Sequence, residues 1–367
     1  MKHYTEKEWN LQNMLEQMSI LESVDAENLP TLEAEHVEVY YPEGEYTFLH
    51  EAAIIEYHGV LYASWYNCTE LELQGRTPIR GRRSYDGGKT WGEIEVIADD
   101  KSGKIMYCPP VYGVCDDKLY MLINEMVAPD HMHALDLFVL NQETDRFELL
   151  WSRPIPFKLN TNVYQLANGK LLLPGRIAEL DKFPNTPAVM ISDSGKIDAE
   201  WRVVNIAEDG NLPDGHKLVH PELSAVIDGE VVYIFCRNDE VNVPLLYISR
   251  DNGEHWTKAI AYDIPFTSSK IYSGTLSNGR NYVIGNIWSG EEWANSRSKL
   301  TIFFSKPGEF KFNEGYLLQD GISQQFGYGQ MWHYPVAHEA DGKLYVIYTA
   351  SVQNPKRGAV VSIIPVK

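Results

Sequence analysis

Six positions along this 367-residue sequence carry side chains that could act together on one substrate. Each lies seven to nine residues before a turn that is followed by an alternating apolar segment. Several of these side chains are histidine, glutamate or tyrosine, which can move protons or attack an electrophilic carbon. In chain order the positions hold His50 and Glu51, Pro109 and Pro110, Asn160 and Asn162, His220 and Glu222, Tyr272 and Ser273, and His333 and Tyr334.

Three of these side chains are candidate catalytic residues: His50, Glu222 and Tyr334. The near-neutral pKa of a histidine lets it accept or donate a proton, and the side chains of glutamate and tyrosine can also transfer protons. The alternative for each is a polar group satisfied by water in a channel. Glu222 could also pair with Arg237 and only hold that guanidinium in place.

Arginines and a few neutral side chains are candidates for binding the substrate. A guanidinium presents two parallel N–H donors to a carboxylate, and a tryptophan offers an apolar face to a sugar ring. The alternatives are a solvated surface arginine and ordinary packing of the tryptophan. The candidate binding residues are Arg237, Arg297, Arg176, Arg80, Asn162, His220 and Trp332.

The repeated turns indicate which fold would bring these residues together. They begin at Gly59, Asp117, Gly169, Gly229, Gly279 and Gly342, and each leads into a strand-like segment such as Val-Leu-Tyr-Ala-Ser-Trp. Turns of this kind join the strands of hairpins, and a blade of a propeller consists of about four short strands. The sequence therefore predicts an all-β protein, a six-bladed β-propeller of four-stranded blades, in which the six positions meet at one axial pocket.

A second motif lies between later strands of some repeats. Residues 84–91 and 249–256 share the pattern Ser-x-Asp-x-Gly-x-x-Trp, and looser forms occupy 192–201 and 305–310. The aspartate can cap a tight turn, the glycine permits a positive φ, and the tryptophan packs over the hairpin. This motif resembles the Asp box, or BNR repeat, of sialidase-like propellers. We interpret it as a turn that stabilises the fold and expect no catalytic role for its aspartates.

The candidate site also resembles that of the sialidases. Residues 220–238 are similar to the sialidase segment in which a glutamate begins an inner strand and an arginine ends the next. In that family the glutamate is the base for a nucleophilic tyrosine, and three arginines bind the substrate carboxylate. The resemblance implies the base for Glu222, the nucleophile for Tyr334, and two of the three arginines for Arg237 and Arg297.

Two departures from the sialidase pattern alter what the resemblance implies. Sialidases begin their first blade with Arg-Ile-Pro, which supplies the first arginine, whereas this chain has His50 near that place. The general-acid aspartate of the family should lie in the loop before Arg82, but residues 70–81 contain no aspartate. Ordinary sialidase activity is therefore not expected.

The segment from His50 to Asn67 instead resembles the first blade of the rhamnosyl-glucuronate and ulvan lyases, related propellers with a catalytic histidine. Our first hypothesis is an exo-acting glycoside hydrolase that acts on a terminal acidic sugar or its neighbour. The first alternative is a polysaccharide lyase in which His50 drives β-elimination at a uronate. The second is a carbohydrate-binding propeller without catalysis.

The two ends of the sequence differ from the repeats. Residues 4–22 have the apolar spacing of an amphipathic helix, so we expect a helical extension over residues 1–30 and a catalytic propeller over 31–367. Residues 33–41 and 359–365 are strand-like, and their pairing would close the ring and remove an open edge. The helix could pack on the propeller or on a second copy, which leaves a homodimer open.

Composition limits the partners and the compartment. The net charge of −19 disfavours nucleic acid, and no apolar run approaches the roughly 18 residues that a membrane helix needs. The four cysteines lack paired spacing, and the first residues lack a secretory signal. We expect a cytoplasmic protein, or a secreted or periplasmic one whose signal was removed, with a glycan or oligosaccharide as its partner. His131 and His133 alternate on one strand without a third ligand, so no metal or other cofactor is expected.

Overall fold

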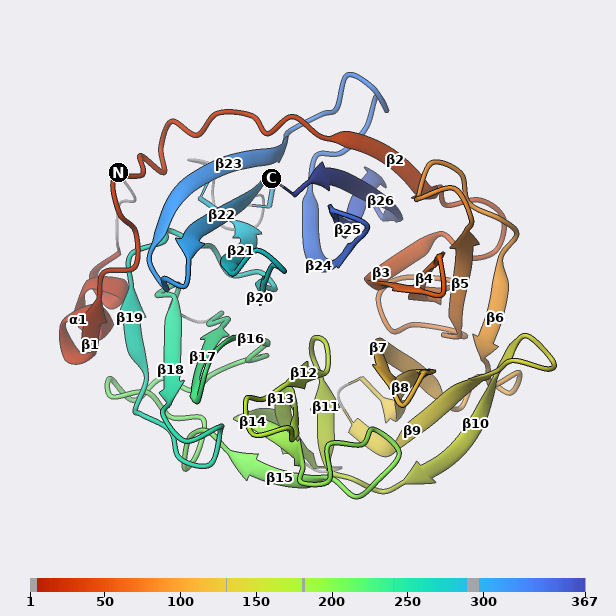
Figure 1. The fold of residues 1–367 in the computed structure, drawn as a ribbon, viewed down its shortest axis with the longest axis horizontal. Coiled ribbons are helices and arrows are strands. Elements are labelled where there is room, and N and C mark those ends of the chain that lie inside the picture. Colours follow the sequence, from red (N-terminus) through yellow and green to blue (C-terminus); the bar gives the residue numbers. More distant parts are fainter. Residues whose placement is uncertain (1–4, 130, 180–181, 240, 289–296, 367) are drawn as a thin grey trace.

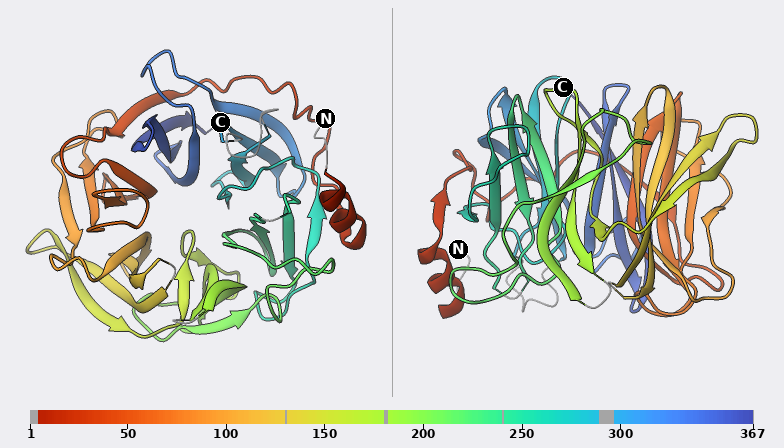
Figure 2. Two further views of the ribbon diagram at one scale, coloured as in Figure 1. Left: turned by 180° about the vertical axis from the view of Figure 1, so that it is seen from behind. Right: turned by 90° about the horizontal axis from the view of Figure 1, so that it is seen from below.

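The protein is a ring of β-sheets that stand around a common axis (Figure 1). The computed structural model describes residues 5–129, 131–179, 182–239, 241–288 and 297–366. Seen from the side, the strands run roughly along that axis (Figure 2). Strands β3, β7, β11, β16, β20 and β24 lie nearest to the axis, so the residues that begin them can meet at one mouth of the ring.

Four of the sheets contain four or five strands each. One consists of β7 (Met106–Cys115), β8 (Lys118–Ala128), β9 (His131–Asn141) and β10 (Arg146–Arg153). The next contains β11 (Phe157–Leu159), β12 (Tyr164–Gln165), β13 (Leu171–Glu179), β14 (Lys182–Ser192) and β15 (Arg202–Asn205). The third contains β16 (Leu223–Asp228), β17 (Val231–Cys236), β18 (Leu245–Ser249), β19 (Ile260–Tyr262) and β1 (Glu16–Met18). The fourth contains β20 (Tyr272–Thr275), β21 (Arg280–Asn286), β22 (Lys299–Pro307) and β23 (Phe312–Asp320).

The fifth sheet has eight strands, and its existence shows that the prediction of six four-stranded blades is wrong. It joins β24 (Trp332–Ala340), β25 (Lys343–Gln353), β26 (Lys356–Pro365) and β2 (Glu35–Tyr40) to β3 (Phe48–Tyr57), β4 (Val60–Cys68), β5 (Ile79–Ser84) and β6 (Glu95–Ala98). The junction is one parallel pair, Arg357 with Phe48, supported by a 3.0 Å hydrogen bond from Arg357 N to Thr47 O. The described strands therefore form five sheets. The turn repeats predicted hairpins correctly, but they contain no information about this junction between sheets.

The predicted pairing of residues 33–41 with 359–365 is confirmed. Strand β2 is antiparallel to β26, with Val37 opposite Val361. The pairing covers the outer edge of β26, which would otherwise present unpaired backbone groups. Val360 and Val361 are fully buried, so the pairing also contributes to the core.

The N-terminal helix is shorter than predicted. Helix α1 spans Glu6–Met14 and begins with a capping box in which Thr5 and Glu8 bond to each other's backbone N–H groups. Residues 16–18 then form β1 and pair in parallel with β19, because an extended segment can occupy the open edge there. Leu11 is buried, whereas Trp9 is about half exposed. The domain boundary at residue 30 stays a prediction. Among the described residues, no helix is long and apolar enough to cross a membrane.

The Asp boxes form the expected turns. Asp86 Oδ1 accepts hydrogen bonds from the backbone of Lys89 and Thr90 at 3.1 and 2.9 Å, and Asp251 Oδ1 accepts one from His255 N at 2.9 Å. Gly253 has a φ of +87°, in the region where residues with a Cβ are strained. The carboxylates cap their own turns, which agrees with a structural role for this motif.

Replacement of Gly253 by alanine tests how far this turn limits stability. A left-handed conformation costs an L-residue about 1–2 kcal/mol, and the new Cβ would lie 3.0 Å from Leu172 Cδ1. The control is Gly229→Ala, at a φ of +59° with nothing within 4 Å of the Cβ. Urea denaturation should show a larger loss of unfolding free energy for Gly253→Ala. Equal losses would show that crowding against Leu172 is not a factor.

Candidate active site

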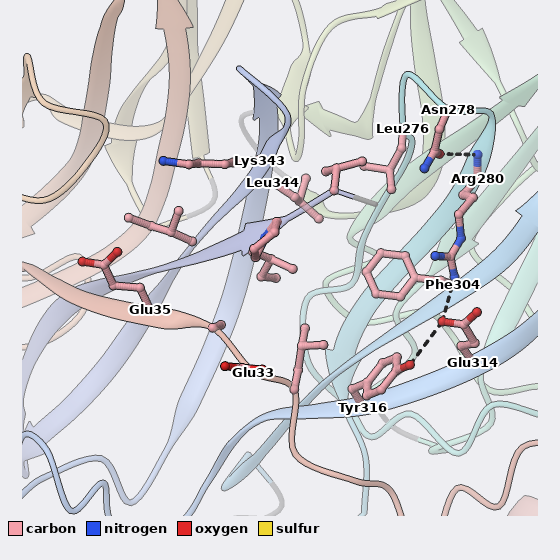
Figure 3. Close-up of a pocket in the computed structure, with 16 residues that line it drawn as sticks. Glu33, Glu35, Leu276, Asn278, Arg280, Phe304, Glu314, Tyr316, Lys343 and Leu344 are labelled. Carbon is pink, nitrogen blue, oxygen red and sulfur yellow. Dashed lines mark hydrogen bonds and ion pairs between the residues drawn. The ribbon is translucent and has the colours of Figure 1, made fainter.

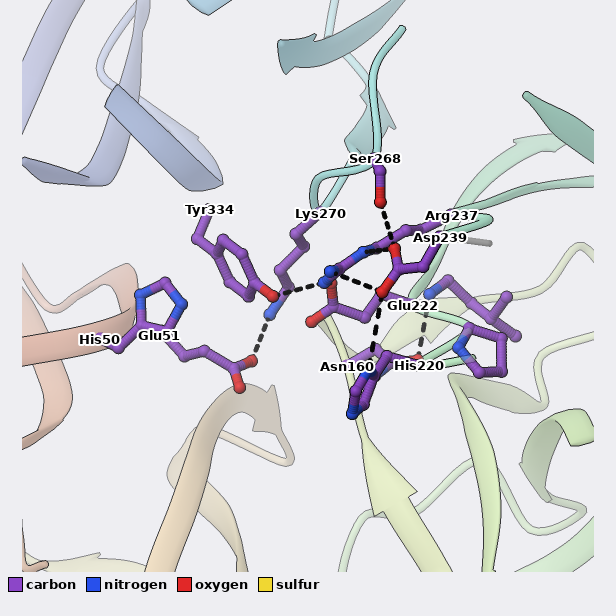
Figure 4. A network of polar contacts seen from close by, with 12 residues as sticks. His50, Glu51, Asn160, His220, Glu222, Arg237, Asp239, Ser268, Lys270 and Tyr334 are labelled. Carbon is purple, nitrogen blue, oxygen red and sulfur yellow. Dashed lines mark hydrogen bonds and ion pairs between the residues drawn. The ribbon is translucent and has the colours of Figure 1, made fainter. Parts of the chain in front are cut away.

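A cavity of about 190 Å³ lies at the axial mouth and draws its walls from several sheets. Its lining includes seven of the ten predicted site residues, and Figure 4 shows several of them converging from the surrounding strands. The structure therefore brings together His50, Glu222, Tyr334, Arg237, Arg297, Arg176 and His220. The cavity is also lined by Glu51, Tyr66, Glu72, Leu73 and Lys158.

Irregular backbone at the start of the inner strands directs these side chains into the cavity. Glu51, His220 and Tyr334 have positive φ angles of 47°, 49° and 60°. The pairing of β3 with β4 shifts register after His50, and the pairing of β24 with β25 shifts after His333. Such bulges redirect side chains and are frequent beside active sites, as is strain in non-glycine residues. The recurrence of this conformation at one mouth of the ring supports a functional site.

Arg237 connects the predicted base and nucleophile. Its Nη1 donates to Glu222 Oε2 and to Tyr334 Oη, each at 2.5 Å. Its Nε and Nη2 donate to the two carboxylate oxygens of Asp239 at 2.5 and 2.8 Å. Four of its five N–H donors are thus bound to groups of the protein. In this arrangement Arg237 organises the site more than it presents a guanidinium to a ligand.

The surroundings place Glu222 and Tyr334 in complementary protonation states. Burial raises the pKa of Glu222, but attraction to Arg237, Lys270 and Arg176 outweighs it and leaves this pKa below its ordinary value. Burial raises the pKa of Tyr334 well above its ordinary value, although Arg237 and Arg297 oppose the shift. At neutral pH the site therefore holds a carboxylate close to a protonated phenol.

Arg297 is the arginine best suited to meet an anionic ligand. Its Nη2 donates to Ser268 O at 3.0 Å, and its guanidinium carbon lies 5.5 Å from the centre of the Tyr334 ring. Burial lowers the pKa of Arg297, yet a guanidinium remains charged in proteins. Within the described part of the chain, no ion pair neutralises it. The backbone holds it firmly, since Trp332 N donates to Arg297 O at 2.9 Å.

His50 lies in the cavity wall as a neutral imidazole. Burial, followed by repulsion from His333 and nearby cations, lowers the pKa of His50 well below its ordinary value of 6.5. Its Nδ1 is 3.1 Å from Thr349 Oγ1, and its ring centre is 4.0 Å from that of Tyr334. A neutral His50 cannot replace the positive charge of the first sialidase arginine.

Glu72 occupies the cavity from the loop in which the sequence analysis looked for an aspartate. Its Oε1 accepts a hydrogen bond from Tyr66 Oη at 3.3 Å and lies 4.0 Å from His50 Nε2. The side chain is about half exposed, so it can reach solvent and a bound ligand. Glutamate has the same acid group as aspartate on a longer side chain. The sequence analysis missed Glu72 because it searched this loop for an aspartate.

Lys270, Asp239 and Lys158 are further charged groups of the site that the sequence analysis did not select. Lys270 Nζ lies 2.8 Å from Glu51 Oε2, and both side chains are buried. Asp239 binds Arg237, while Lys158 lines the cavity opposite Arg176 in the pairing of β11 with β13. Lys270 lies nine residues before the turn at Gly279, the same offset as His50, but the sequence analysis selected Tyr272 and Ser273 in that repeat. Asp239 and Lys158 lie outside the repeated positions, so the repeat did not reveal them.

Three predicted binding residues do not line the cavity, and their roles in binding stay predictions. Asn162 Nδ2 donates to Tyr272 Oη at 2.5 Å and lines another cavity. Arg80 belongs to the third strand of its hairpin group, where its guanidinium carbon lies 4.6 Å from the Tyr46 ring centre. Trp332 is fully buried and donates from Nε1 to Gly321 O at 2.7 Å. Successive strand residues face opposite sides, so the residue before His333 points away from the axis.

A second cavity, of about 600 Å³, has a different character (Figure 3). Its lining includes Lys343 and Leu344, which follow the C-terminal end of β24, whereas His333 lies near the N-terminal end of that strand. The hairpin that contains Arg280 also lines this cavity. Arg280 Nη2 lies 2.9 Å from Glu314 Oε2, which also accepts a hydrogen bond from Tyr316 Oη at 3.2 Å. These charged groups satisfy one another, so this cavity offers no comparable set of reactive groups.

The described residues contain no group of three or more side chains suited to hold a metal ion. His133 Nε2 is 4.0 Å from Glu125 Oε2, and Asp130 of the same segment lies outside the described residues.

Comparison with known proteins agrees with this class of fold. Residues 59–346 match the family described as the BNR repeat-like domain, and the chain belongs to this family. The sialidase-like character inferred from the Asp boxes is confirmed at this level. The sequence matches no curated protein.

Solved structures of similar fold include both uncharacterised proteins and sialidases. A protein of unknown function from Dyadobacter fermentans is 14% identical, with a TM-score of 0.69 over 91% of this chain and 99% of the other. Trypanosoma rangeli sialidase in complex with sialic acid is 15% identical, with a TM-score of 0.66 over 91% of this chain and 59% of the sialidase. A leech intramolecular trans-sialidase is 12% identical, with a TM-score of 0.66 over 91% and 70%. At these identities the similarity shows a shared fold, and the likeness to the lyases stays a prediction.

Acid should destabilise the protein through its buried histidines. Burial also lowers the pKa of His333 well below 6.5, and neither of its ring nitrogens has a hydrogen-bond partner among the residues that the structure describes. The unfolded chain then binds protons that the folded chain excludes, so stability falls as pH drops below 6.5. Each of the two histidines should contribute up to about 1.4 kcal/mol per pH unit.

Unfolding free energies measured by urea denaturation between about pH 7.5 and pH 5.5 test this expectation. His333→Gln should flatten the pH dependence, whereas His133→Gln, at a side chain that is 57% exposed, should leave it unchanged. An unaltered slope in His333→Gln would contradict the assignment of this histidine as a buried neutral group.

Proposed function

We propose that the protein is an exo-acting glycoside hydrolase that cleaves beside a terminal acidic sugar. The observation that supports this most directly is the bridge from Arg237 Nη1 to both Glu222 and Tyr334, at 2.5 Å each. Both oxygen atoms lie within hydrogen-bond distance of one nitrogen, so they are no more than twice that distance apart. A modest movement would allow the phenol proton to pass directly to the Glu222 carboxylate.

The proposed reaction proceeds through the tyrosine. Tyr334 Oη forms a bond to the anomeric carbon while its proton passes to Glu222, and the glycosidic C–O bond breaks. Glu72 donates a proton to the departing oxygen. It then removes a proton from the water that bonds to the anomeric carbon, while the bond from that carbon to Tyr334 Oη breaks and Glu222 returns its proton to the phenolate oxygen. A phenol suits an anionic substrate, because a neutral nucleophile avoids the repulsion that a carboxylate nucleophile would meet.

Charge and size define the class of substrate. Arg297, Arg176 and Lys158 line the cavity and can attract a carboxylate. The volume of about 190 Å³ is below the range of about 300–1,000 Å³ usual for drug-sized ligands, which favours a single terminal sugar over an internal segment of a chain. Because His50 is neutral, the place of the first sialidase arginine carries no positive charge, so ordinary sialidase activity is not proposed.

The two alternatives become outcomes of the activity assay. Oligosaccharides that end in sialic acid or in a hexuronic acid are incubated with the protein, and the products are separated by chromatography. Released acidic sugar supports hydrolysis. Ultraviolet absorbance of an unsaturated uronate would indicate elimination, and binding without products would indicate a carbohydrate-binding protein; either result contradicts the proposal.

Glu72→Gln tests the proposed acid. Loss of a general acid typically lowers the rate by about 10²–10⁴-fold, and the loss should be smaller for a substrate with an aryl leaving group, which needs less protonation. The control is Glu70→Gln, an exposed residue of the same loop that does not line the cavity. Steady-state kinetics with both leaving groups measure the effect. Wild-type rates for Glu72→Gln with a sugar leaving group would rule out this role.

A trapped intermediate tests the proposed nucleophile. A fluorinated analogue of the active substrate, which slows release of the sugar, should leave one sugar attached to the peptide that contains Tyr334. Mass spectrometry of the digested protein locates the label, and Tyr334→Phe serves as the control. Attachment at Glu222 or Glu72 in place of Tyr334 would contradict the mechanism.

A further inference from the structure

Three cations surround the ring of Tyr334 at nearly equal distances. The charged groups of Arg297, Lys270 and Arg237 lie 5.5, 5.7 and 5.8 Å from the ring centre. The two arginines are those that the sequence predicted. The third cation comes from Lys270, which lies just before β20 and belongs to a different sheet from the strand that contains His50.

Lys270 is not a residue that a ligand can touch. Its side chain is buried, and it is not part of the cavity lining. Figure 4 shows it extending past the Tyr334 ring toward Glu51, which lies 2.8 Å away at Oε2. Any effect of Lys270 on a reaction must therefore pass through the groups beside it.

Glu51, the partner of Lys270, lies in the segment where this sequence departs from the sialidase pattern. Glu51 follows His50 directly and has a positive φ, so the bulge of β3 turns its carboxylate toward the axis. A buried carboxylate here needs a positive partner, and Lys270 supplies one from a different sheet. We propose that Lys270 is a positioning residue that supplies the third positive charge around the tyrosine and keeps the Glu222 carboxylate in its ion-paired form.

Several charged groups face Glu222, and the contribution of Lys270 must be separated from theirs. After Arg237, Lys270 is the strongest of the positive groups that lower the pKa of Glu222 against the effect of burial. The charged or titratable groups that surround Glu222 are Arg237 and Asp239 after β17, Arg176 in β13, Lys270 before β20, Arg297 before β22, His220 before β16, Glu51 in β3 and Tyr334 in β24.

Opposite charges in the buried pair predict opposite effects on Glu222. Lys270→Met removes a positive charge and leaves Glu51 in place, so the protonation midpoint of Glu222 should move to higher pH. Glu51→Gln removes the negative charge and leaves Lys270, so the midpoint should move to lower pH. The double variant removes the pair as a unit without leaving a buried charge unpaired, and its midpoint should lie between those of the single variants.

Carbon-13 NMR of the glutamate carboxyl groups measures this without a substrate. The Glu222 resonance is assigned by its absence in Glu222→Gln, and the titration is repeated in each variant. Lys270→Arg retains the charge and should keep the wild-type midpoint. If Lys270 had a purely structural role, the protonation midpoint of Glu222 would shift in the same direction in Lys270→Met and in Glu51→Gln. Shifts in one direction, or no shift in the folded single variants, would overturn the proposal.

A kinetic experiment connects this inference to the proposed function, on which its catalytic meaning rests. With a hydrolysed substrate, Lys270→Met should raise the pH at which kcat falls on the acid side. KM should change little, because Lys270 does not touch the ligand. Absence of hydrolysis would refute the proposed function and leave the NMR result to decide the role of Lys270. A large rise in KM with an unchanged pH profile would contradict the positioning role.

Discussion

The cost of burying charge is the constraint on which the axial site depends. Removal of an ionised group from water is unfavourable unless the group is paired and hydrogen-bonded. At the mouth of this ring, Arg237 is paired with Glu222 and Asp239, and Lys270 with Glu51. Arg237 and Asp239 follow β17 and Glu222 precedes β16 of the same sheet, whereas Lys270 and Glu51 belong to different sheets. The charge network therefore joins the sheets at the point where the candidate chemistry is located.

The ring and the network support each other. Hairpins bring the ends of distant inner strands to one axis, and bulges after His50 and His333 let side chains leave the alternation of a regular strand. Residues in left-handed conformations, Glu51 and Tyr334 among them, are unfavourable alone and persist where their surroundings fix them. Here the fixing contacts are the same ion pairs and hydrogen bonds that set the protonation of Glu222 and Tyr334. Stability and reactivity thus depend on shared contacts.

Sequence reasoning was successful where periodicity constrains position. The repeat located Glu222 and Tyr334 because each begins an inner strand, and the hairpin after Glu222 located Arg237. It was unsuccessful where position depends on loops or on local geometry. Glu72 belongs to a connecting segment with no repeat, Lys270 was passed over for Tyr272 and Ser273 in the same repeat, and Trp332 faces the opposite side of a strand from His333. The union of two hairpin groups through a single residue pair, Arg357 with Phe48, has no signature in sequence, so the number of sheets could not be predicted.

The choice between hydrolysis and elimination depends on which basic group is linked to the tyrosine. Burial lowers the pKa of His50 well below its ordinary value of 6.5, and its ring packs against Tyr334, 4.0 Å away between ring centres. Cations beside Glu222 lower the pKa of this carboxyl group too, so both groups are in the form that can accept a proton. Arg237 donates hydrogen bonds to both Glu222 and the Tyr334 phenol. This link favours transfer of the phenol proton to Glu222, and therefore attack by Tyr334 at an anomeric carbon, over removal of a proton by His50.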